Sequence, residues 1–298
     1  MAIAAIDRPS DRVTAPAVSR PLTAFVLSGG ASLGAAQVGM LEALYERRIV
    51  PDFLVGTSVG ALNAASISSR PTAIDTVTKL ARVWLSLERE DVFPVSLSSL
   101  VGGMCGRRNH LVSDGALRRL VGRYLEFERL EDAPIPLHLV AFDVTNGREL
   151  LLSHEPARDA VAASAAIPGV FPPVSIDERR LIDGGVVNNT PISHAVELGA
   201  ERIYVLATQY PCHPLKNAPK TALDAALHGL GLVIGSRLEA DIARYSGEVE
   251  LVVLPGPDTA GVQPTGFEHS SALIRAARLL ARAALARDRQ GRHLRVAR

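Results

Sequence analysis

The residues best suited to chemistry are the serine and the two glycines of Gly56-Thr57-Ser58-Val59-Gly60. A short, mostly apolar stretch at 52–55 precedes them and an alanine-rich stretch at 61–67 follows. The pattern therefore predicts a strand, a sharp turn and a helix, with Ser58 at the turn. The glycines let neighbouring backbone approach closely, and the helix directs its positive end at the hydroxyl. We interpret Ser58 as a nucleophile; the alternative is a loop serine without chemistry.

A glycine loop, Gly29-Gly30-Ala31-Ser32-Leu33-Gly34, lies between an apolar stretch at 22–28 and a helical pattern at 35–48. Backbone N–H groups in such a turn can bind a developing oxyanion. The alternative is a dinucleotide-binding fingerprint, which requires glycine where Ala31 stands and an acidic residue at the end of the next strand. That strand runs into the serine turn instead, so oxyanion binding is the favoured interpretation.

The base that would activate Ser58 is less obvious. The conventional order of serine, aspartate and histidine can be written as Ser58, Asp183 and His269, but His269 stands where the last helix is predicted to begin and suits the cap region of that helix. Asp183 follows an apolar pair and precedes Gly184-Gly185, so its carboxylate is expected at a strand end on a turn of close approach. Two interpretations stay open at this point: Asp183 is the base, or it stabilises a tight turn.

The elements that must position these residues alternate between strand and helix over the first seventy residues, which favours a parallel sheet wrapped by helices. Further strands are predicted at 137–144, 148–153, 202–208 and 249–254, the first two joined by a turn at Asn146-Gly147. Further helices are predicted at 72–89, 114–124, 158–167, 192–198, 221–245 and 270–289.

Three segments carry more specific expectations. The helix at 192–198 should have Thr190 as its N-cap and Pro191 in its first position. The apolar, proline-rich segment at 169–176 reads as a crossing connection. The looser apolar segment at 92–104 has two interpretations, a mobile lid over an apolar pocket or an irregular packed connection.

Composition sets the wider limits. The chain has 298 residues, 47% of them apolar, and a net charge of +1, so it can bury a large core and has no general attraction to nucleic acid. We expect one domain at 21–290, with a motif-bearing core at 22–208 and a helical part at 221–290, between a disordered tail at 1–20 and a basic tail at 291–298.

Targeting and cofactor signals are weak. The two cysteines, Cys105 and Cys212, have no cysteine or histidine at ligand spacing, so neither a disulfide framework, a metal nor a cofactor is expected. We expect neither a secretion signal nor a membrane-spanning segment, and a cytoplasmic location. The arginine-rich segment after Ser270 leaves two interpretations open: a helix lying on an anionic membrane surface, or a packed helix with a solvated basic face.

Taken together, the ordered motifs resemble the patatin-like phospholipase family. The resemblance rests on the glycine loop, the serine turn, Asp183-Gly184-Gly185, the stretch from Ala165 to Pro173 that precedes it, and the stretch at 143–153; it covers about 22–208. It implies a three-layer α/β/α fold with a mostly parallel central sheet, and a lipid acyl hydrolase that uses a Ser-Asp dyad without histidine.

On the matching positions, the resemblance assigns Ser58 as nucleophile, Asp183 as base, and Gly29, Gly30 and Ala31 as oxyanion hole. The remaining motif glycines support the site: Gly34, Gly56, Gly60, Gly184 and Gly185.

Two positions depart from the family pattern. The family loop has a third glycine where this chain has Ala31, which should limit φ to values usual for a residue with a Cβ. It has a basic residue where this chain has Leu33, which removes a positive charge.

The implied function is a phospholipase A or lysophospholipase acting on a lipid or fatty-acyl ester, with peripheral contact to a membrane. The alternatives are an acyltransferase or thioesterase that uses the same acyl-serine, and a catalytically silent lipid-binding protein. The oligomeric state does not follow from these residues.

Overall fold

The computed structural model describes residues 20–69, 73–94, 110–209, 222–259, 262–263 and 265–288. The predicted tails, apart from Arg20, and most of the 92–104 segment lie outside these residues. Arg20 was expected in the disordered tail, but its guanidinium pairs with the Asp52 carboxylate at 2.5 and 3.0 Å.

Eight strands of the described residues form one sheet in the order β5-β6-β3-β2-β1-β7-β8, with β4 paired to β3. The strands are β1 (Thr23–Leu27), β2 (Phe53–Thr57), β3 (Leu137–Asp143), β4 (Arg148–Leu152), β5 (Val174–Ile176), β6 (Arg179–Asp183), β7 (Arg202–Leu206) and β8 (Glu250–Leu254). The run from β3 through β2, β1 and β7 to β8 is parallel, whereas β4, β5 and β6 pair antiparallel at one edge. The sheet is therefore mostly parallel, as expected.

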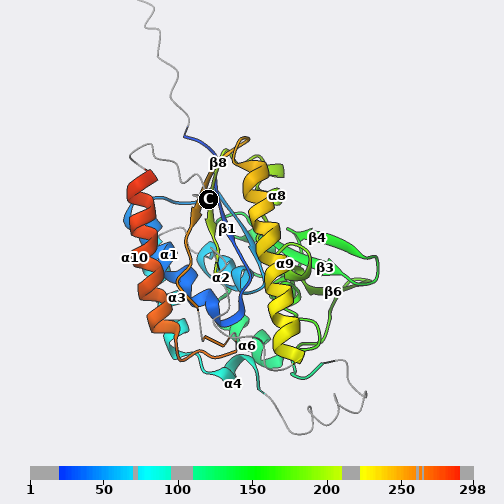
Figure 1. Cartoon of the computed structure of the whole chain (residues 1–298). Coiled ribbons are helices and arrows are strands. Elements are labelled where there is room, and N and C mark those ends of the chain that lie inside the picture. The colour runs from blue at the N-terminus through cyan, green and yellow to red at the C-terminus, as the bar shows by residue number, and fades with distance from the viewer. Residues whose placement is uncertain are drawn as a thin grey trace, which may run out of the picture.

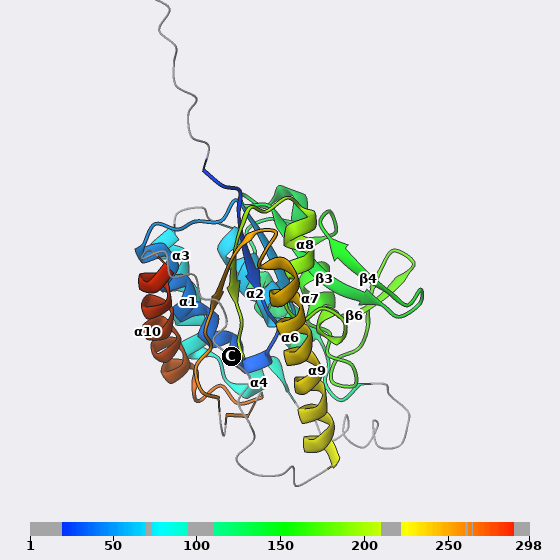
Figure 2. The ribbon, with the colours of Figure 1, turned by 45° about the horizontal axis from the view of Figure 1, so that its top comes forward.

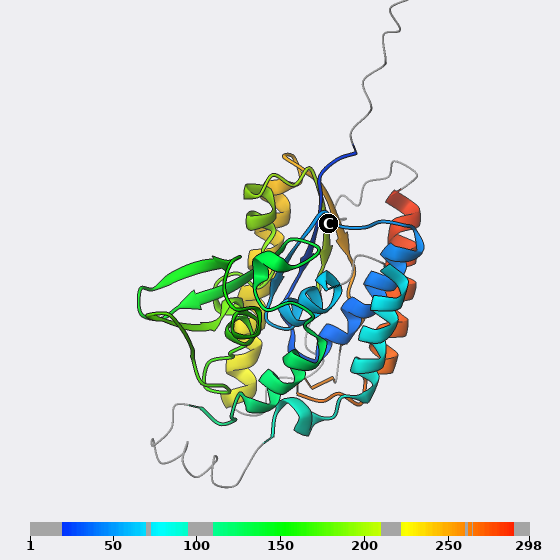
Figure 3. The same ribbon diagram turned by 180° about the vertical axis from the view of Figure 1, so that it is seen from behind.

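Helices cover both faces of this sheet and make a three-layer α/β/α fold (Figures 1 and 3). On one face lie α8 (Ile192–Glu197) and α9 (Ala222–Tyr245). The other face carries α1 (Ala35–Glu46), α2 (Val59–Ser68), α3 (Ala73–Ser86), α6 (Gly115–Tyr124), α7 (Ala157–Ser164) and α10 (Ser270–Asp288). The short elements are α4 (Arg89–Val92), η1 (Ala31–Gly34), η2 (Leu130–Asp132) and η3 (Gly184–Val186).

The apolar character of β1 follows from its place at the centre of the sheet. Successive side chains of a strand point to opposite faces, so Ala24 and Val26 pack towards α8 and α9 while Phe25 and Leu27 pack towards α1 and α2. All four are fully buried. A strand covered on both faces reads as a continuous apolar run rather than an alternating one, as the sequence of 22–28 does.

Strand register brings the two ends of the candidate site together. In the parallel pair, Thr57 of β2 lies opposite Val140 of β3, and in the antiparallel pair Ala141 of β3 lies opposite Asp183 of β6. The last residue of β2 and the last residue of β6 therefore flank adjacent residues of one strand. Ser58, which follows Thr57, emerges beside Asp183 although 125 residues separate them.

Two local expectations were wrong. The helix predicted at 192–198 begins at Ile192 with Pro191 in the N-cap position, so Thr190 stands one residue before the cap. A proline at that position lacks the side-chain oxygen that caps a helix. Within the predicted crossing connection, Val174–Ile176 is strand β5, which pairs with β6.

Candidate active site

Ser58 occupies a strained turn between β2 and α2. Its φ of 57° and ψ of −125° lie outside the regions that residues with a Cβ normally adopt. Such strain persists only where the surroundings fix the backbone. Here the Ser58 N–H donates to Ser164 Oγ at 3.0 Å, and Ser164 Oγ donates to the Val140 carbonyl at 2.6 Å. The turn is thus anchored to β3 and α7.

The two glycines of the serine turn are required by close backbone contact. A Cβ on Gly60 would lie 2.2 Å from the Leu27 carbonyl oxygen, and a Cβ on Gly56 would lie 2.7 Å from the Gly60 carbonyl oxygen. Neither oxygen can move without breaking the junction of β1, β2 and α2. The glycines therefore let α2 start directly against the end of the central strands.

Asp183 ends β6 with its carboxylate facing the serine. Its Oδ2 accepts a hydrogen bond from Ser58 Oγ at 2.6 Å, and its Oδ1 accepts one from the Gly185 N–H at 2.7 Å. The close approach of this turn needs Gly184, because a Cβ there would lie 2.5 Å from the Val140 carbonyl oxygen. Of the two interpretations left open for Asp183, the turn-stabilising bond and the contact with Ser58 are both present.

Burial sets the electrostatics of this pair. Asp183 is 5% exposed, and loss of solvation raises the pKa of its carboxyl to about 6, although the hydrogen bonds from Ser58 and the Gly185 N–H pull it down. At neutral pH the carboxylate is therefore mostly ionised, yet it is more basic than an ordinary aspartate. A group with these properties can accept a proton from a hydroxyl.

Three described histidines have side-chain partners other than Ser58 and Asp183. His138 contacts Ser153, and His194 contacts Glu149 and Glu197. His269 is 46% exposed at its side chain, faces Glu268, and stands immediately before the first residue of α10. The order Ser58, Asp183, His269 is thus not assembled as a triad, and the hydroxyl contacts a carboxylate directly.

The glycine loop presents backbone amides beside the serine. A Cβ on Gly29 would lie 3.1 Å from the Ser58 Cβ, so this loop and the serine turn are in direct contact. In the described part of the chain, the N–H groups of Gly30 and Ala31 have no hydrogen-bond acceptor. The N–H of Gly29 does have one, the Asn189 carbonyl at 3.0 Å, and in this conformation it is not free to bind an oxyanion.

The departures in the loop have different consequences. Ala31 has a φ of 50°, so the expectation that it would avoid left-handed backbone is wrong: the loop keeps this shape despite the Cβ. Leu33 is 1% exposed and belongs to the apolar core. Gly34 is required by packing, since a Cβ there would lie 2.4 Å from a methyl group of Val59.

Comparison with known proteins decides the family. The family model described as patatin-like phospholipase matches residues 25–196, more than half of the chain. The chain belongs to the patatin-like phospholipase family. The match runs from the middle of β1 into α8 and includes the glycine loop, the serine turn and Asp183.

Curated relatives are longer than this chain. An uncharacterized NTE family protein of Mycobacterium tuberculosis is 26% identical over 277 residues, which are 87% of this chain and 46% of the relative. Patatin-like phospholipase domain-containing protein 6 of Mus musculus is 28% identical over 186 residues, 61% of this chain and 13% of the relative. The chain therefore spans about half the length of the mycobacterial relative and a much smaller part of the mouse protein. Among solved structures, VipD from Legionella pneumophila superimposes with a TM-score of 0.48 at 15% identity, covering 90% of this chain and 67% of that one.

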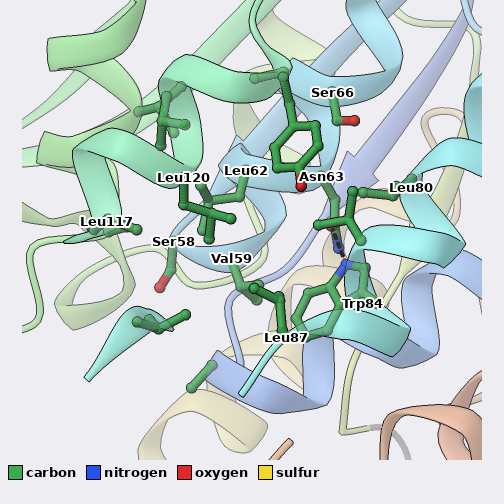
Figure 4. A pocket seen from close by; sticks show the side chains of 18 of the residues that line it. Ser58, Val59, Leu62, Asn63, Ser66, Leu80, Trp84, Leu87, Leu117 and Leu120 are labelled. Carbon is green, nitrogen blue, oxygen red and sulfur yellow. Dashed lines mark hydrogen bonds between the residues drawn. The ribbon is translucent and has the colours of Figure 1, made fainter. Parts of the chain in front are cut away.

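An apolar pocket lies beside the serine of this patatin-like chain (Figure 4). Side chains from α2, α3 and α6 face into it, and Ser58 lies at its wall. Its empty space, including the part open to solvent, is about 800 Å³. The lining includes Leu62, Leu80, Trp84, Leu87, Leu117 and Leu120. The space suits a hydrocarbon chain.

Aromatic rings complete the lining of this pocket. Phe93 stacks on Phe171 with ring centroids 5.6 Å apart, and Trp84 stacks on Phe267 at 6.0 Å. Val92 and Phe93, the first described residues of the segment expected as a lid or packed connection, therefore belong to the pocket wall. The rest of that segment, 95–104, lies outside the described residues.

A buried polar chain joins the pocket to the glycine loop. The Trp84 indole N–H donates to Asn63 Oδ1 at 2.9 Å (Figure 4). Asn63 Nδ2 in turn donates to Gln37 Oε1 at 2.8 Å and to the Gly34 carbonyl at 3.0 Å. Gln37 Nε2 continues to the Ser28 carbonyl at 2.8 Å. Each of these polar side chains is nearly inaccessible to water, so the bonds fix the loop relative to α1, α2 and α3.

Two features are absent from the described residues. In that part of the chain, no group of three or more histidine, cysteine, aspartate or glutamate side chains is placed to hold a metal ion. The same residues contain no helix with the length and apolar character needed to cross a membrane.

Proposed function

We propose that this chain is a serine lipid acyl hydrolase of the phospholipase A or lysophospholipase type, which cleaves carboxylic esters through an acyl-serine on Ser58. The observation that carries the proposal is the 2.6 Å hydrogen bond from Ser58 Oγ to the buried Asp183 carboxylate. Membership of the patatin-like phospholipase family supports a lipid substrate. The apolar pocket beside Ser58 supports binding of its acyl chain.

The reaction proceeds by two acyl transfers. Ionised Asp183 accepts the hydroxyl proton as Ser58 Oγ attacks the ester carbonyl carbon. The carbonyl oxygen becomes an oxyanion beside the Gly30 and Ala31 amides, whose donated hydrogen bonds lower the barrier. When the intermediate collapses, the bond to the alcohol oxygen breaks and Asp183 returns the proton to that oxygen.

Water completes the cycle in the second transfer. It attacks the acyl carbon while Asp183 accepts one of its protons. The bond to Ser58 Oγ then breaks, Asp183 returns the proton to that oxygen, and the fatty acid leaves. The N–H of Val59, which follows the nucleophile and has no acceptor among the described residues, is a further donor for the oxyanion and was not anticipated from the sequence.

The proposed base predicts a pH dependence. Asp183 must be ionised to accept the serine proton, and burial raises its pKa to about 6. We expect kcat/KM for a soluble ester to rise by about tenfold for each pH unit below that value and to level off above it. Rates between pH 4.5 and 8, each corrected for folded enzyme, measure this. A profile flat down to pH 4.5 would argue against Asp183 as the base.

A fluorophosphonate probe tests the nucleophile directly. We expect the folded wild-type chain to be labelled at Ser58, and Ser58→Ala to be unlabelled. Asp183→Asn should react about 10²–10⁴-fold more slowly, because it lacks the base. Ser68→Ala is the matched control, because it removes a buried serine hydroxyl from α2, the helix that follows Ser58. That hydroxyl donates to the Ala65 carbonyl, so the variant should be labelled at the wild-type rate.

The alternatives give different outcomes. No labelling of the folded wild-type chain would contradict the proposal and favour a silent lipid-binding protein. Labelling together with transfer of the acyl group to an added alcohol or thiol, in preference to water, would instead indicate an acyltransferase. Release of free fatty acid from a phospholipid, measured by mass spectrometry of the products, supports the hydrolase and identifies which ester is cleaved.

A further inference from the structure

Every backbone polar group of the Ser28–Gly29 segment has a protein partner. The Ser28 N–H donates to the Leu206 carbonyl at 3.3 Å, and the Ser28 carbonyl accepts from Gln37 Nε2 at 2.8 Å. The Gly29 N–H donates to the Asn189 carbonyl at 3.0 Å, and the Gly29 carbonyl accepts from Thr208 Oγ1 at 2.6 Å. The N–H groups of the next two residues, Gly30 and Ala31, have no acceptor among the described residues.

Thr208 controls one peptide plane of this loop. A trans peptide is planar, and its carbonyl and N–H point in opposite directions. The Gly29 carbonyl and the Gly30 N–H belong to the same peptide unit. Because the hydroxyl of Thr208 holds that carbonyl, it also directs the Gly30 N–H away from Thr208. The next residue, Ala31, lines the apolar pocket together with Ser58.

Packing holds Thr208 in place for this contact. Its side chain lies against the bare Cα of Gly30, where a Cβ would come within 2.3 Å of Thr208 Oγ1. Its own N–H donates to Ser28 Oγ at 3.0 Å, and the residue is 2% exposed. The Thr208 hydroxyl lies nearer to the Gly29 carbonyl, at 2.6 Å, than the Ser28 hydroxyl, which also donates to it at 3.2 Å, and burial keeps water from competing for that carbonyl.

We propose that Thr208 is a positioning residue for the oxyanion hole: its hydroxyl aims the Gly30 amide at the substrate carbonyl oxygen. Thr208 does not touch the substrate and acts through the Gly29–Gly30 peptide. This inference rests on the proposed ester hydrolysis at Ser58. It adds a determinant that lies after β7, twelve residues beyond the end of the family match at 196.

The test compares three variants with the wild-type chain. Thr208→Val keeps the branched shape but replaces the hydroxyl by a methyl group, whereas Thr208→Ser keeps the hydroxyl. Thr23→Val is the matched control, because Thr23 is 5% exposed and its hydroxyl also donates to a backbone carbonyl, that of Pro21 at 2.9 Å, at the other end of β1. All are assayed on a soluble ester and with a trifluoromethyl ketone, which forms an oxyanion on attack by serine.

Loss of one complete oxyanion donor costs about 10²–10³-fold in kcat. A donor that is present but misdirected should cost less, so we expect Thr208→Val to lower kcat by about 10–100-fold with KM within about threefold. Affinity for the trifluoromethyl ketone should fall by the same factor as kcat, since both report the oxyanion. Thr208→Ser should recover most of kcat, and Thr23→Val should retain it.

The inference and the proposed function fail in different ways. If the wild-type chain neither hydrolyses the ester nor reacts with a fluorophosphonate, both the proposed function and the role of Thr208 are contradicted. If the wild type is active and Thr208→Val matches Thr23→Val in kcat and in ketone affinity, the inference alone is overturned. If Thr208→Val does not fold, Thr208→Ala removes the same hydroxyl, and the same comparison with Thr208→Ser and Thr23→Val decides.

Discussion

The Ser58–Asp183 pair and the adjoining apolar pocket are held together by different kinds of contact. Around the pair, backbone packs on backbone: added Cβ atoms on Gly60 or Gly184 would meet carbonyl oxygens at 2.2 and 2.5 Å. The pocket is made of apolar side chains from separate helices. Backbone contacts of this kind accept one residue type, whereas apolar side chains of similar volume replace one another at small cost. The two regions should therefore respond very differently to substitution.

The largest expected effect is that of Gly60→Ala. Its Cβ would lie 2.2 Å from the Leu27 carbonyl oxygen, so α2 and β1 must separate. Overpacking of a rigid core costs about 1–3 kcal/mol and more where backbone has to move. We expect a loss of 3 kcal/mol or more in the free energy of unfolding, measured by urea denaturation, together with loss of fluorophosphonate labelling.

Gly231→Ala is the control for that substitution. Gly231 lies in α9, has nothing within 4 Å of an added Cβ, and does not adopt a positive φ. Alanine in a helix interior is favoured over glycine by about 0.8–1.0 kcal/mol. The same chemical change should therefore stabilise the chain slightly. Equal stability of Gly60→Ala and Gly231→Ala would contradict the idea that close backbone contact, and not the loss of glycine itself, makes Gly60 necessary.

The second effect concerns the cost of burying Asp183. Burial raises the pKa of its carboxyl from 3.8 to about 6. As pH rises through this window the unfolded chain releases the proton while the folded chain still holds it, so the folded state loses stability. At 1.36 kcal/mol per unit, the full cost above pH 6 is about 3 kcal/mol. Asp183→Asn removes this titration. It should match the wild-type stability near pH 4 and exceed it by up to about 3 kcal/mol at pH 7–8.

Urea denaturation of both proteins at several pH values measures the difference. Ser68→Ala serves again as a reference, because its hydroxyl lies in the same helix as the serine turn but does not touch Asp183. Its stability relative to the wild type should not change with pH. If the stability advantage of Asp183→Asn over the wild type, in free energy of unfolding, became smaller as pH rises, that would contradict a raised pKa of the Asp183 carboxyl.

The same contrast explains which features could be predicted from the sequence. Ser58, Asp183 and their flanking glycines stood out because the backbone geometry permits few residue types, so the requirement is visible as a motif. The alternation of strands and helices predicted the mostly parallel sheet for a similar reason, since burial on both faces forces continuous apolar strands. The family resemblance added the pairing of Ser58 with Asp183, which are distant in the sequence, whereas the edge strand β5 was not predicted.

The pocket and the supports of the loop could not be predicted in this way. Leu117 and Trp84 fit the apolar face of an amphipathic helix, and the same pattern describes core residues that line no cavity. Thr208 acts through a single hydroxyl after β7, without a motif of its own. The engagement of the Gly29 amide by Asn189 depends on two loops that are distant in sequence. Such contacts follow from the tertiary arrangement alone.

The pocket should respond gradually to substitution. Leu120 of α6 lines it, so Leu120→Trp adds volume inside the acyl site. We expect kcat/KM for long-chain esters to fall by about tenfold relative to short-chain esters, which corresponds to about 1.4 kcal/mol. Leu85→Trp is the matched control, because Leu85 is 57% exposed on α3 and should leave the chain-length profile unchanged. Equal profiles for both variants would mean that the acyl chain binds elsewhere.

The smallest effect is expected from the exposed arginine side chains of α10. Arg282 donates to Glu46 of α1 at 2.7 and 2.8 Å, and Arg278 pairs with the same carboxylate (Figure 2 shows α1 beside α10). These pairs favour the packed-helix interpretation of the arginine-rich segment over a helix lying on a membrane.

Exposed ion pairs contribute about 0–1 kcal/mol and are screened by salt. Arg282→Gln should therefore lower the free energy of unfolding by less than about 1 kcal/mol at low salt and by nothing measurable in ~1 M NaCl. Arg275→Gln, whose arginine bonds to the Ser271 hydroxyl, should show no salt dependence. Loss of binding to anionic vesicles in Arg282→Gln at unchanged stability would instead favour the membrane interpretation.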